Sequence, residues 1–140
     1  MGAHKYIERT IGAWIASRYR SAAEVGVGEN DVAARTILAA GGKIICTDIR
    51  EPERPLAVPI IIDDIYSPDT AFYEGIEVIY AIRPAEEMVP ALIALARRLN
   101  CDLIVYHLGF EIYGDGGEII DCGVVLHRYH KCQNPSKRVF

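Results

Sequence analysis

The sequence of 140 residues predicts a single α/β domain of the Rossmann type over residues 1–140. Short apolar segments alternate with amphipathic helical segments, and the early apolar segments have no polar face, which is typical of parallel strands covered by helices. A glycine-rich turn leads from the first strand into a helix. We therefore expect a mostly parallel sheet of order 3-2-1-4-5, with helices on both faces and an antiparallel strand at its C-terminal edge.

The first half of the chain contains two helical segments and three strand segments. Apolar residues recur at helical spacing over residues 6–19, which predicts an amphipathic helix within residues 1–20. The second helix begins near Asn30, a favourable N-cap residue, and stops at Gly41 and Gly42, a common C-terminal signal. Three apolar runs that are too short for helices predict strands over residues 22–27, 43–48 and 60–62. The prolines within residues 50–59 make that segment a connection.

The second half adds one helix and at least three strands. A helix is predicted over residues 85–99, with a kink or a late start at Pro90. Glycines at 114, 116 and 117 predict a turn, and the polar tail over residues 131–140 is expected to be flexible. The strand segments are residues 76–82, residues 102–108 and at least one strand within residues 118–130.

Charge and composition argue against several classes of protein. Nineteen acidic residues against fifteen basic ones give a formal net charge of −4, which argues against a dedicated nucleic-acid-binding protein. No apolar run reaches the roughly 18–20 residues needed to span a bilayer. The charged N-terminal segment does not resemble a signal peptide, so we expect a cytoplasmic protein.

The C-terminal third contains two cysteines and two histidines, which are potential metal ligands. Their spacing, C-x4-H-x2-H-x-C, departs from the patterns of zinc sites, so we expect no metal there. The sequence assigns no role to these residues, which are Cys122, His127, His130 and Cys132.

A cluster of glycines and carboxylates falls at the carboxyl ends of the first three predicted strands. Gly26 and Gly28 permit unusual backbone angles beside a helix N-terminus, where a ligand can approach the main chain. Asp48 lies twenty residues after Gly28, a spacing at which a carboxylate accepts hydrogen bonds from ribose hydroxyls. We therefore expect a nucleoside-type ligand. The residues predicted to bind it are Glu24, Gly26, Gly28, Asn30, Asp48, Asp63 and Asp64.

The choice of ligand depends on Asp31, which occupies the place of the third glycine in the dinucleotide fingerprint. An acidic side chain there would face a pyrophosphate unfavourably, so NAD(P) is the weaker alternative. S-adenosylmethionine carries no phosphate and has two cationic groups, which suit acidic surroundings.

On these residues the sequence resembles the class I S-adenosylmethionine-dependent methyltransferases over residues 21–108, through E-V-G-V-G and the later T-D. It is more similar still to a family of small uncharacterised archaeal proteins with a Rossmann-like, methyltransferase-related fold. The segments that carry this similarity are EVGVGENDVAARTILAAGGKIICTDI, DDIYSP, YAIRPAEEM and LIVYHLGFE. The methyltransferase pattern implies that Glu24, Gly26 and Gly28 line the methionine side of the ligand. It further implies that Asp48 holds the ribose and that Asp63 or Asp64 lies near the adenine.

Two departures from the methyltransferase pattern bear on activity. Asn30 stands where the family often has another glycine, and Ile82-Arg83-Pro84-Ala85 stands where many members have Asp/Asn-Pro-Pro-aromatic. Binding of S-adenosylmethionine or S-adenosylhomocysteine is therefore the better supported expectation. Methyl transfer to an acceptor that the sequence does not identify is the further step, and a non-catalytic nucleotide-binding or regulatory module is the alternative.

Arg83 and His107 are weak candidates for catalytic residues. Arg83 ends the fourth strand, where it either clamps an anionic group of a substrate or pairs with Glu86 or Glu87. His107 and Glu111 follow the fifth strand, where they either serve acid–base chemistry or form local hydrogen bonds. Aliphatic edge strands also allow a homodimer or a protein partner.

Overall fold

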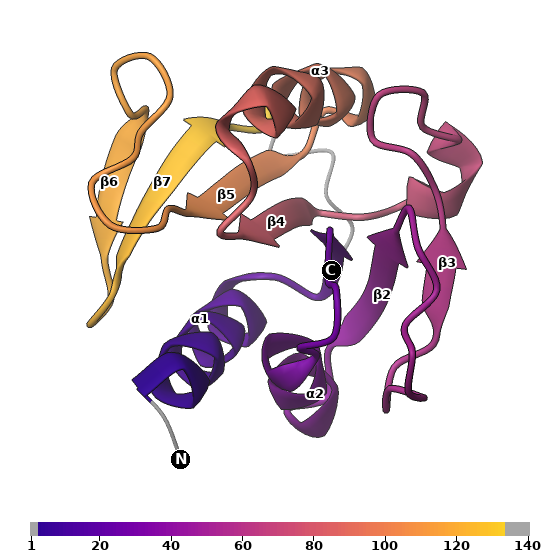
Figure 1. The fold of residues 1–140 in the computed structure, drawn as a ribbon. Coiled ribbons are helices and arrows are strands. Elements are labelled where there is room, and N and C mark those ends of the chain that lie inside the picture. The colour runs from indigo at the N-terminus through magenta and orange to yellow at the C-terminus, as the bar shows by residue number, and fades with distance from the viewer. Residues whose placement is uncertain (1–2, 134–140) are drawn as a thin grey trace.

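A seven-stranded sheet organises the structure, a computed structural model that describes residues 3–133 (Figure 1). The order of its strands is β3-β2-β1-β4-β5-β7-β6. Neighbouring strands from β3 to β5 are parallel, whereas β7 is antiparallel to both β5 and β6. The strands are β1 (Ser21–Val25), β2 (Lys43–Asp48), β3 (Ile60–Ile62), β4 (Val78–Ile82), β5 (Asp102–Tyr106), β6 (Glu118–Asp121) and β7 (Val125–His130).

Helices cover both faces of the sheet (Figure 1). One face carries α1 (Ala3–Arg18) and α2 (Val32–Ala39), and the other carries α3 (Val89–Leu99). Gly12 lets α1 approach α2 closely, because a Cβ there would lie 2.6 Å from the carbonyl oxygen of Ala33. Within the described residues, no helix is both long and apolar enough to cross a membrane.

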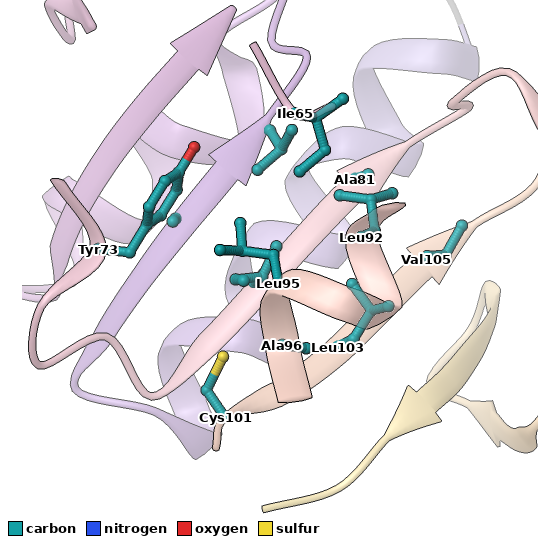
Figure 2. Close-up of a cluster of buried hydrophobic side chains, with 12 residues drawn as sticks. Ile65, Tyr73, Ala81, Leu92, Leu95, Ala96, Cys101, Leu103 and Val105 are labelled. Atoms are coloured by element: carbon teal, nitrogen blue, oxygen red, sulfur yellow. The ribbon is translucent and has the colours of Figure 1, made fainter. Parts of the chain in front are cut away.

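Two hydrophobic cores fill the layers on either side of the sheet. Under α3, Leu92 and Leu95 pack against Ala81, Leu103 and Val105 (Figure 2). On the opposite face, α1 and α2 cover a second cluster whose largest fully buried members include Ile11, Ile15, Ile37, Tyr80, Ile104 and Leu126. Because each central strand alternates its side chains between these cores, its apolar sequence has no polar face.

The fold agrees with the predicted class, and the differences are local. The helix predicted from residue 85 begins at Val89, after the 3-10 turn η2 (Glu86–Met88). Pro90 thus falls in the first turn of α3, where its missing N–H removes no helical hydrogen bond. A second 3-10 turn, η1 (Thr70–Tyr73), stands between β3 and β4.

The C-terminal segment forms a hairpin of two strands, β6 and β7, where the sequence predicted at least one strand. Gly123 adopts a φ of 103° in the turn, and the N–H of Gly123 donates to Oδ1 of Asp121. β7 pairs with β5, so β6 is the outermost strand on that side. The flexible tail predicted over residues 131–140 lies mostly outside the described residues, and no helix joins β5 to β6.

The topology places a crevice at the centre of the sheet. From β1 the chain proceeds to β2 and β3 on one side, whereas β4 and β5 lie on the other. The connections after β1 and β4 therefore separate at the carboxyl edge of the sheet. Doubly wound folds bind ligands at such a point.

Candidate ligand-binding site

A cavity of about 350 Å³ opens at the carboxyl ends of β1, β2, β3 and β4. Its volume falls within the usual range of small-molecule sites, roughly 300–1,000 Å³. Five residues that the sequence indicated line it: Gly26, Asp48, Asp63, Asp64 and Arg83. Glu24, Gly28 and Asn30 are not among its lining residues.

The glycine turn is fastened to the end of β2. Gly26 and Gly28 have φ angles of 76° and 61°, in the left-handed region that glycine adopts without strain. The N–H of Gly26 donates to the carbonyl of Thr47 at 2.8 Å. The N–H of Gly28 donates to Oδ2 of Asp48, also at 2.8 Å. The predicted twenty-residue spacing therefore brings the turn and the carboxylate into direct contact.

Asp48 retains acceptor capacity beyond these contacts. Its second oxygen, Oδ1, accepts the N–H of Arg50 at 3.1 Å. Each carboxylate oxygen can accept about two hydrogen bonds, and each of these accepts one from the backbone. The side chain is thus oriented by the main chain while it lines the cavity.

Asp63 and Asp64 shape the loop that follows β3. Oδ1 of Asp63 accepts the N–H of Asp69, and Oδ2 lies 2.9 Å from the hydroxyl of Tyr73. That hydroxyl also lies 3.1 Å from Oγ1 of Thr47. Because an ionised carboxylate can only accept, Tyr73 donates to Asp63 and accepts from Thr47. Burial raises the pKa of the Tyr73 hydroxyl above its usual value, so it remains protonated.

Asp64 has a simpler local role, because its Oδ1 accepts the N–H of Tyr66. Tyr66 and Ile49 line the cavity with largely exposed side chains, and Met88 adds a third apolar wall. Ile49 and Met88 were missed by the sequence reasoning. Ile49 directly follows Asp48, so its place at the strand end was a usable signal.

Glu24 lies beneath the site. Its side chain is 2% exposed, and Oε1 accepts the hydroxyl of Tyr80 at 2.8 Å on the face of the sheet that α1 and α2 cover. Burial raises the pKa of Glu24 to about 8, and the nearby carboxylates of Glu8 and Asp31 contribute to the increase. The carboxyl group is therefore mostly protonated at pH 7. Its role in binding a cofactor stays a prediction.

Asn30 and Arg83 both donate hydrogen bonds to Glu8, a residue that the sequence reasoning did not single out. The N-cap position of α2 is Asp31 rather than Asn30, although Oδ1 of Asn30 accepts the N–H of Val32. The amide Nδ2 of Asn30 donates to Oε2 of Glu8 at 3.1 Å. The same oxygen accepts from Nη1 of Arg83 at 2.5 Å. The ion pair of Arg83 is thus with Glu8 on α1, and the alternative that paired it with Glu86 or Glu87 is wrong.

Asp31 does not have the position that the sequence argument gave it. Its carboxylate is buried and accepts from Nε of Arg35 at 2.9 Å and from the N–H of Ala57 at 2.8 Å. It is not among the residues that line the cavity. The expectation that Asp31 would face a pyrophosphate is wrong, so this electrostatic argument against NAD(P) no longer holds.

His107 lies outside the cavity lining, in a separate aromatic cluster. Its Nε2 is 2.6 Å from the hydroxyl of Tyr129, and its ring centre is 5.0 Å from that of His127. Burial and the neighbouring His127 lower the pKa of His107. Its hydrogen-bond partner in the described chain is Tyr129 on β7, 22 positions further along the chain, rather than Glu111.

The histidine side chains near the C-terminus are held by hydrogen bonds to the backbone. Nδ1 of His127 bonds to the carbonyl of Gly116 at 2.7 Å, and Nδ1 of His130 bonds to that of Cys101 at 2.9 Å. Within residues 3–133, no group of three or more His, Cys, Asp or Glu residues could hold a metal ion.

Several structural neighbours are methyltransferases by name, and two of them illustrate the similarity. A sugar N-methyltransferase, KedS8 of Streptoalloteichus sp., has a TM-score of 0.54 and 14% identity over 86% of this chain and 55% of its own. Human N-acetylserotonin methyltransferase, in a complex with S-adenosylmethionine, has a TM-score of 0.55 and 14% identity over 74% of this chain and 35% of its own. Such identities show a shared fold alone.

A third neighbour, DesVI of Streptomyces venezuelae, has a TM-score of 0.56 and 13% identity over 81% of this chain. This chain spans 58% of the length of DesVI. It therefore covers between about a third and three fifths of these three solved proteins.

Sequence comparison identifies much nearer relatives. The model of the uncharacterised protein family UPF0146 matches residues 9–115. A UPF0146 protein of Archaeoglobus fulgidus is 31% identical over 75% of this chain and 78% of its own length. Another from Pyrococcus horikoshii is 31% identical over 76% of this chain and 85% of its own. The chain belongs to the UPF0146 family, and it shares its fold with methyltransferases of known structure.

Proposed function

We propose that this chain binds S-adenosylmethionine or S-adenosylhomocysteine in the cavity at the carboxyl edge of its sheet. The observation that carries the proposal is the hydrogen bond from the N–H of Gly28 to Asp48, which joins the glycine turn to a residue that lines the cavity. This arrangement presents a carboxylate to ribose hydroxyls beside main chain that a ligand can approach closely. The named methyltransferases with the same fold lend support.

The charges of the cavity agree with this ligand class. Four carboxylates, those of Asp48, Asp63, Asp64 and Glu87, line it together with the single guanidinium of Arg83. Acidic walls favour hydroxyl donors and cations, and they disfavour a ligand with several phosphates. The acidic lining of the cavity therefore favours an adenosyl compound over NAD(P). This argument does not depend on Asp31, which does not line the cavity.

Within the cavity, Asp48 would accept hydrogen bonds from the ribose. The apolar side chains of Ile49 and Tyr66 would contact the adenine, near Asp63 and Asp64. S-adenosylmethionine supplies an activated methyl group when it is bound. The chain would contribute by orienting that group towards an acceptor, because holding two reactants in line lowers the barrier of a bimolecular step.

A non-catalytic binding module is the second candidate, and one observation favours it. The loop between β5 and β6 exposes three large apolar side chains, Leu108, Phe110 and Ile112, and Phe110 is fully exposed. Such a surface is typical of contact with a partner protein. In addition, His107 does not line the cavity, so the weak candidate for an acid–base group is not at the ligand.

Isothermal titration calorimetry tests the proposal, with S-adenosylmethionine, S-adenosylhomocysteine, NAD and NADP titrated separately. We expect both adenosyl compounds to bind. Asp48→Ala should weaken that binding by about 10- to 150-fold, because a hydrogen bond to a charged group contributes about 1.5–3 kcal/mol. Glu74→Gln, an exposed carboxylate outside the cavity lining, is the matched control. Absence of heat with both adenosyl compounds would refute the proposal.

A further inference from the structure

Glu8 of α1 is a buried carboxylate with one satisfied and one unsatisfied oxygen. The residue is 1% exposed. Its Oε2 accepts from Nη1 of Arg83 and from Nδ2 of Asn30. Its Oε1 is buried and has no hydrogen-bond partner within the described chain. A buried carboxylate oxygen without a donor is costly to folding, so a functional explanation is warranted.

Arg83 complements this carboxylate from the cavity side. It follows β4, lines the cavity and adopts a φ of 55°, which is uncommon for a residue with a side chain. Its guanidinium lies over the ring of Tyr106, 5.2 Å from the ring centre, which restrains the plane of the group. Nη1 is its one hydrogen-bonded side-chain nitrogen among the described residues. The other N–H groups of the fork are available for an anion.

The ion pair of Glu8 and Arg83 therefore offers free N–H donors, on Arg83, next to a free acceptor, Oε1 of Glu8. Arginine forks match carboxylate groups, and an unsatisfied carboxylate oxygen accepts from an ammonium group. An α-amino acid carries both groups on one carbon atom. A ligand with only a carboxylate or only an ammonium would satisfy one half of the pair.

The location of the pair agrees with one end of the proposed ligand. Glu8 joins Asn30, in the turn after β1, to Arg83, after β4. These two connections are the ones that separate at the carboxyl edge of the sheet. The site is thus beside the glycine turn, at the side of the cavity away from Asp63 and Asp64, which follow β3.

We propose that Glu8 and Arg83 bind a zwitterionic α-amino-acid group, namely the methionine end of the adenosyl ligand. The inference rests on the proposed function and adds a binding role for α1, a helix to which the methyltransferase pattern assigned no ligand contact. Arg83 binds the carboxylate with its remaining N–H groups, and Oε1 of Glu8 accepts from the ammonium. Glu8 does not itself line the cavity, and its Oε1 is buried. The Arg83 side chain, which lines the cavity and is 27% exposed, must therefore shift before the ammonium group can reach Oε1.

Three ligands test this inference on the unmodified protein by calorimetry. They are S-adenosylhomocysteine, its analogue without the amino group, and 5′-methylthioadenosine, which keeps the adenosine but lacks the amino-acid group. We expect S-adenosylhomocysteine to bind at least about tenfold more tightly than either of the others. Affinities within twofold of one another would overturn the inference while the proposed function stood. No binding of any of the three would overturn both.

A variant assigns the effect to the pair. Glu8→Gln keeps the shape of the side chain and removes its charge, and Glu74→Gln is the exposed control. We expect Glu8→Gln to weaken the binding of S-adenosylhomocysteine by about tenfold or more. The affinity for 5′-methylthioadenosine should change by less than twofold. Equal weakening of both ligands would assign Glu8 a purely structural role and contradict the inference. Where Glu8→Gln fails to fold, Arg83→Lys keeps a positive charge and removes the planar fork, and it should show the same selective weakening.

Discussion

Replacement of Glu24 by glutamine tests whether this buried carboxyl group is protonated in the folded protein. Its pKa is raised from 4.5 to about 8, chiefly by burial. In the unfolded chain the group ionises near its ordinary value. Between these two pKa values the folded state binds more protons than the unfolded state, so the stability that neutral Glu24 contributes is lost as pH rises from about 4.5 to 8. Above pH 8 the loss is complete.

The glutamine side chain in Glu24→Gln would mimic the protonated carboxyl group, because its carbonyl can still accept the hydroxyl of Tyr80. The stability of Glu24→Gln relative to the natural chain should therefore increase by at most about 1.4 kcal/mol for each pH unit. From pH 5 to pH 8 the increase reaches at most about 4 kcal/mol. Other titrating groups are common to both proteins, so their effects cancel in the difference.

Urea unfolding at pH 5, 6, 7 and 8 measures this difference. Trp14 is the single tryptophan and lies on α1, so its fluorescence reports the packing of the face that covers Glu24. We expect the difference in unfolding free energy to grow steadily with pH. A difference that stays constant from pH 5 to pH 8 would mean that Glu24 is ionised in the fold, and would refute the reasoning.

Three further predictions concern packing, the loop after β3 and the histidine cluster. Gly12→Ala should destabilise the fold by about 1–3 kcal/mol in urea unfolding, because its Cβ would lie 2.6 Å from the carbonyl oxygen of Ala33. Unchanged stability would show that α1 can move away from α2. Tyr73→Phe should cost about 1 kcal/mol through the lost hydrogen bond to Asp63, again by urea unfolding, and a neutral result would contradict that bond. In an NMR titration, the ring of His107 should protonate below the ordinary pKa of histidine, since burial and the neighbouring His127 disfavour the charge. An ordinary or raised value would contradict the burial of this ring.

Local sequence patterns predicted most of the fold because their physical causes are local. The spacing between Gly28 and Asp48 reflects one helix and one strand of standard length, and it becomes a 2.8 Å hydrogen bond. The late start of α3 followed from the fixed backbone of Pro90. The hairpin of β6 and β7 was also within reach, since Asp121, Cys122 and Gly123 form a typical turn sequence.

Contacts between distant segments could not be predicted in this way. Glu8 and Arg83 are 75 positions apart, whereas Glu86 and Glu87 are close to Arg83 in sequence. The ion-pair partners that sequence reasoning considered were therefore the near carboxylates, although the fold brings α1 to the end of β4. Asp31 illustrates the same difficulty, because its partner Ala57 belongs to the irregular connection after β2. Such a connection has no periodic pattern from which its path could be derived.

Amide chemical-shift mapping with S-adenosylhomocysteine tests the central claim most directly, because it reports both binding and its location. We expect saturable shifts at the cavity, at Gly26, Asp48, Ile49 and Asp64. The opposite edge of the sheet, at Gly41, Gly42 and Gly75, lines a separate cavity and should remain unchanged. No saturable shifts, or shifts confined to that opposite edge, would contradict the assignment of an adenosyl-binding site to the carboxyl ends of the strands.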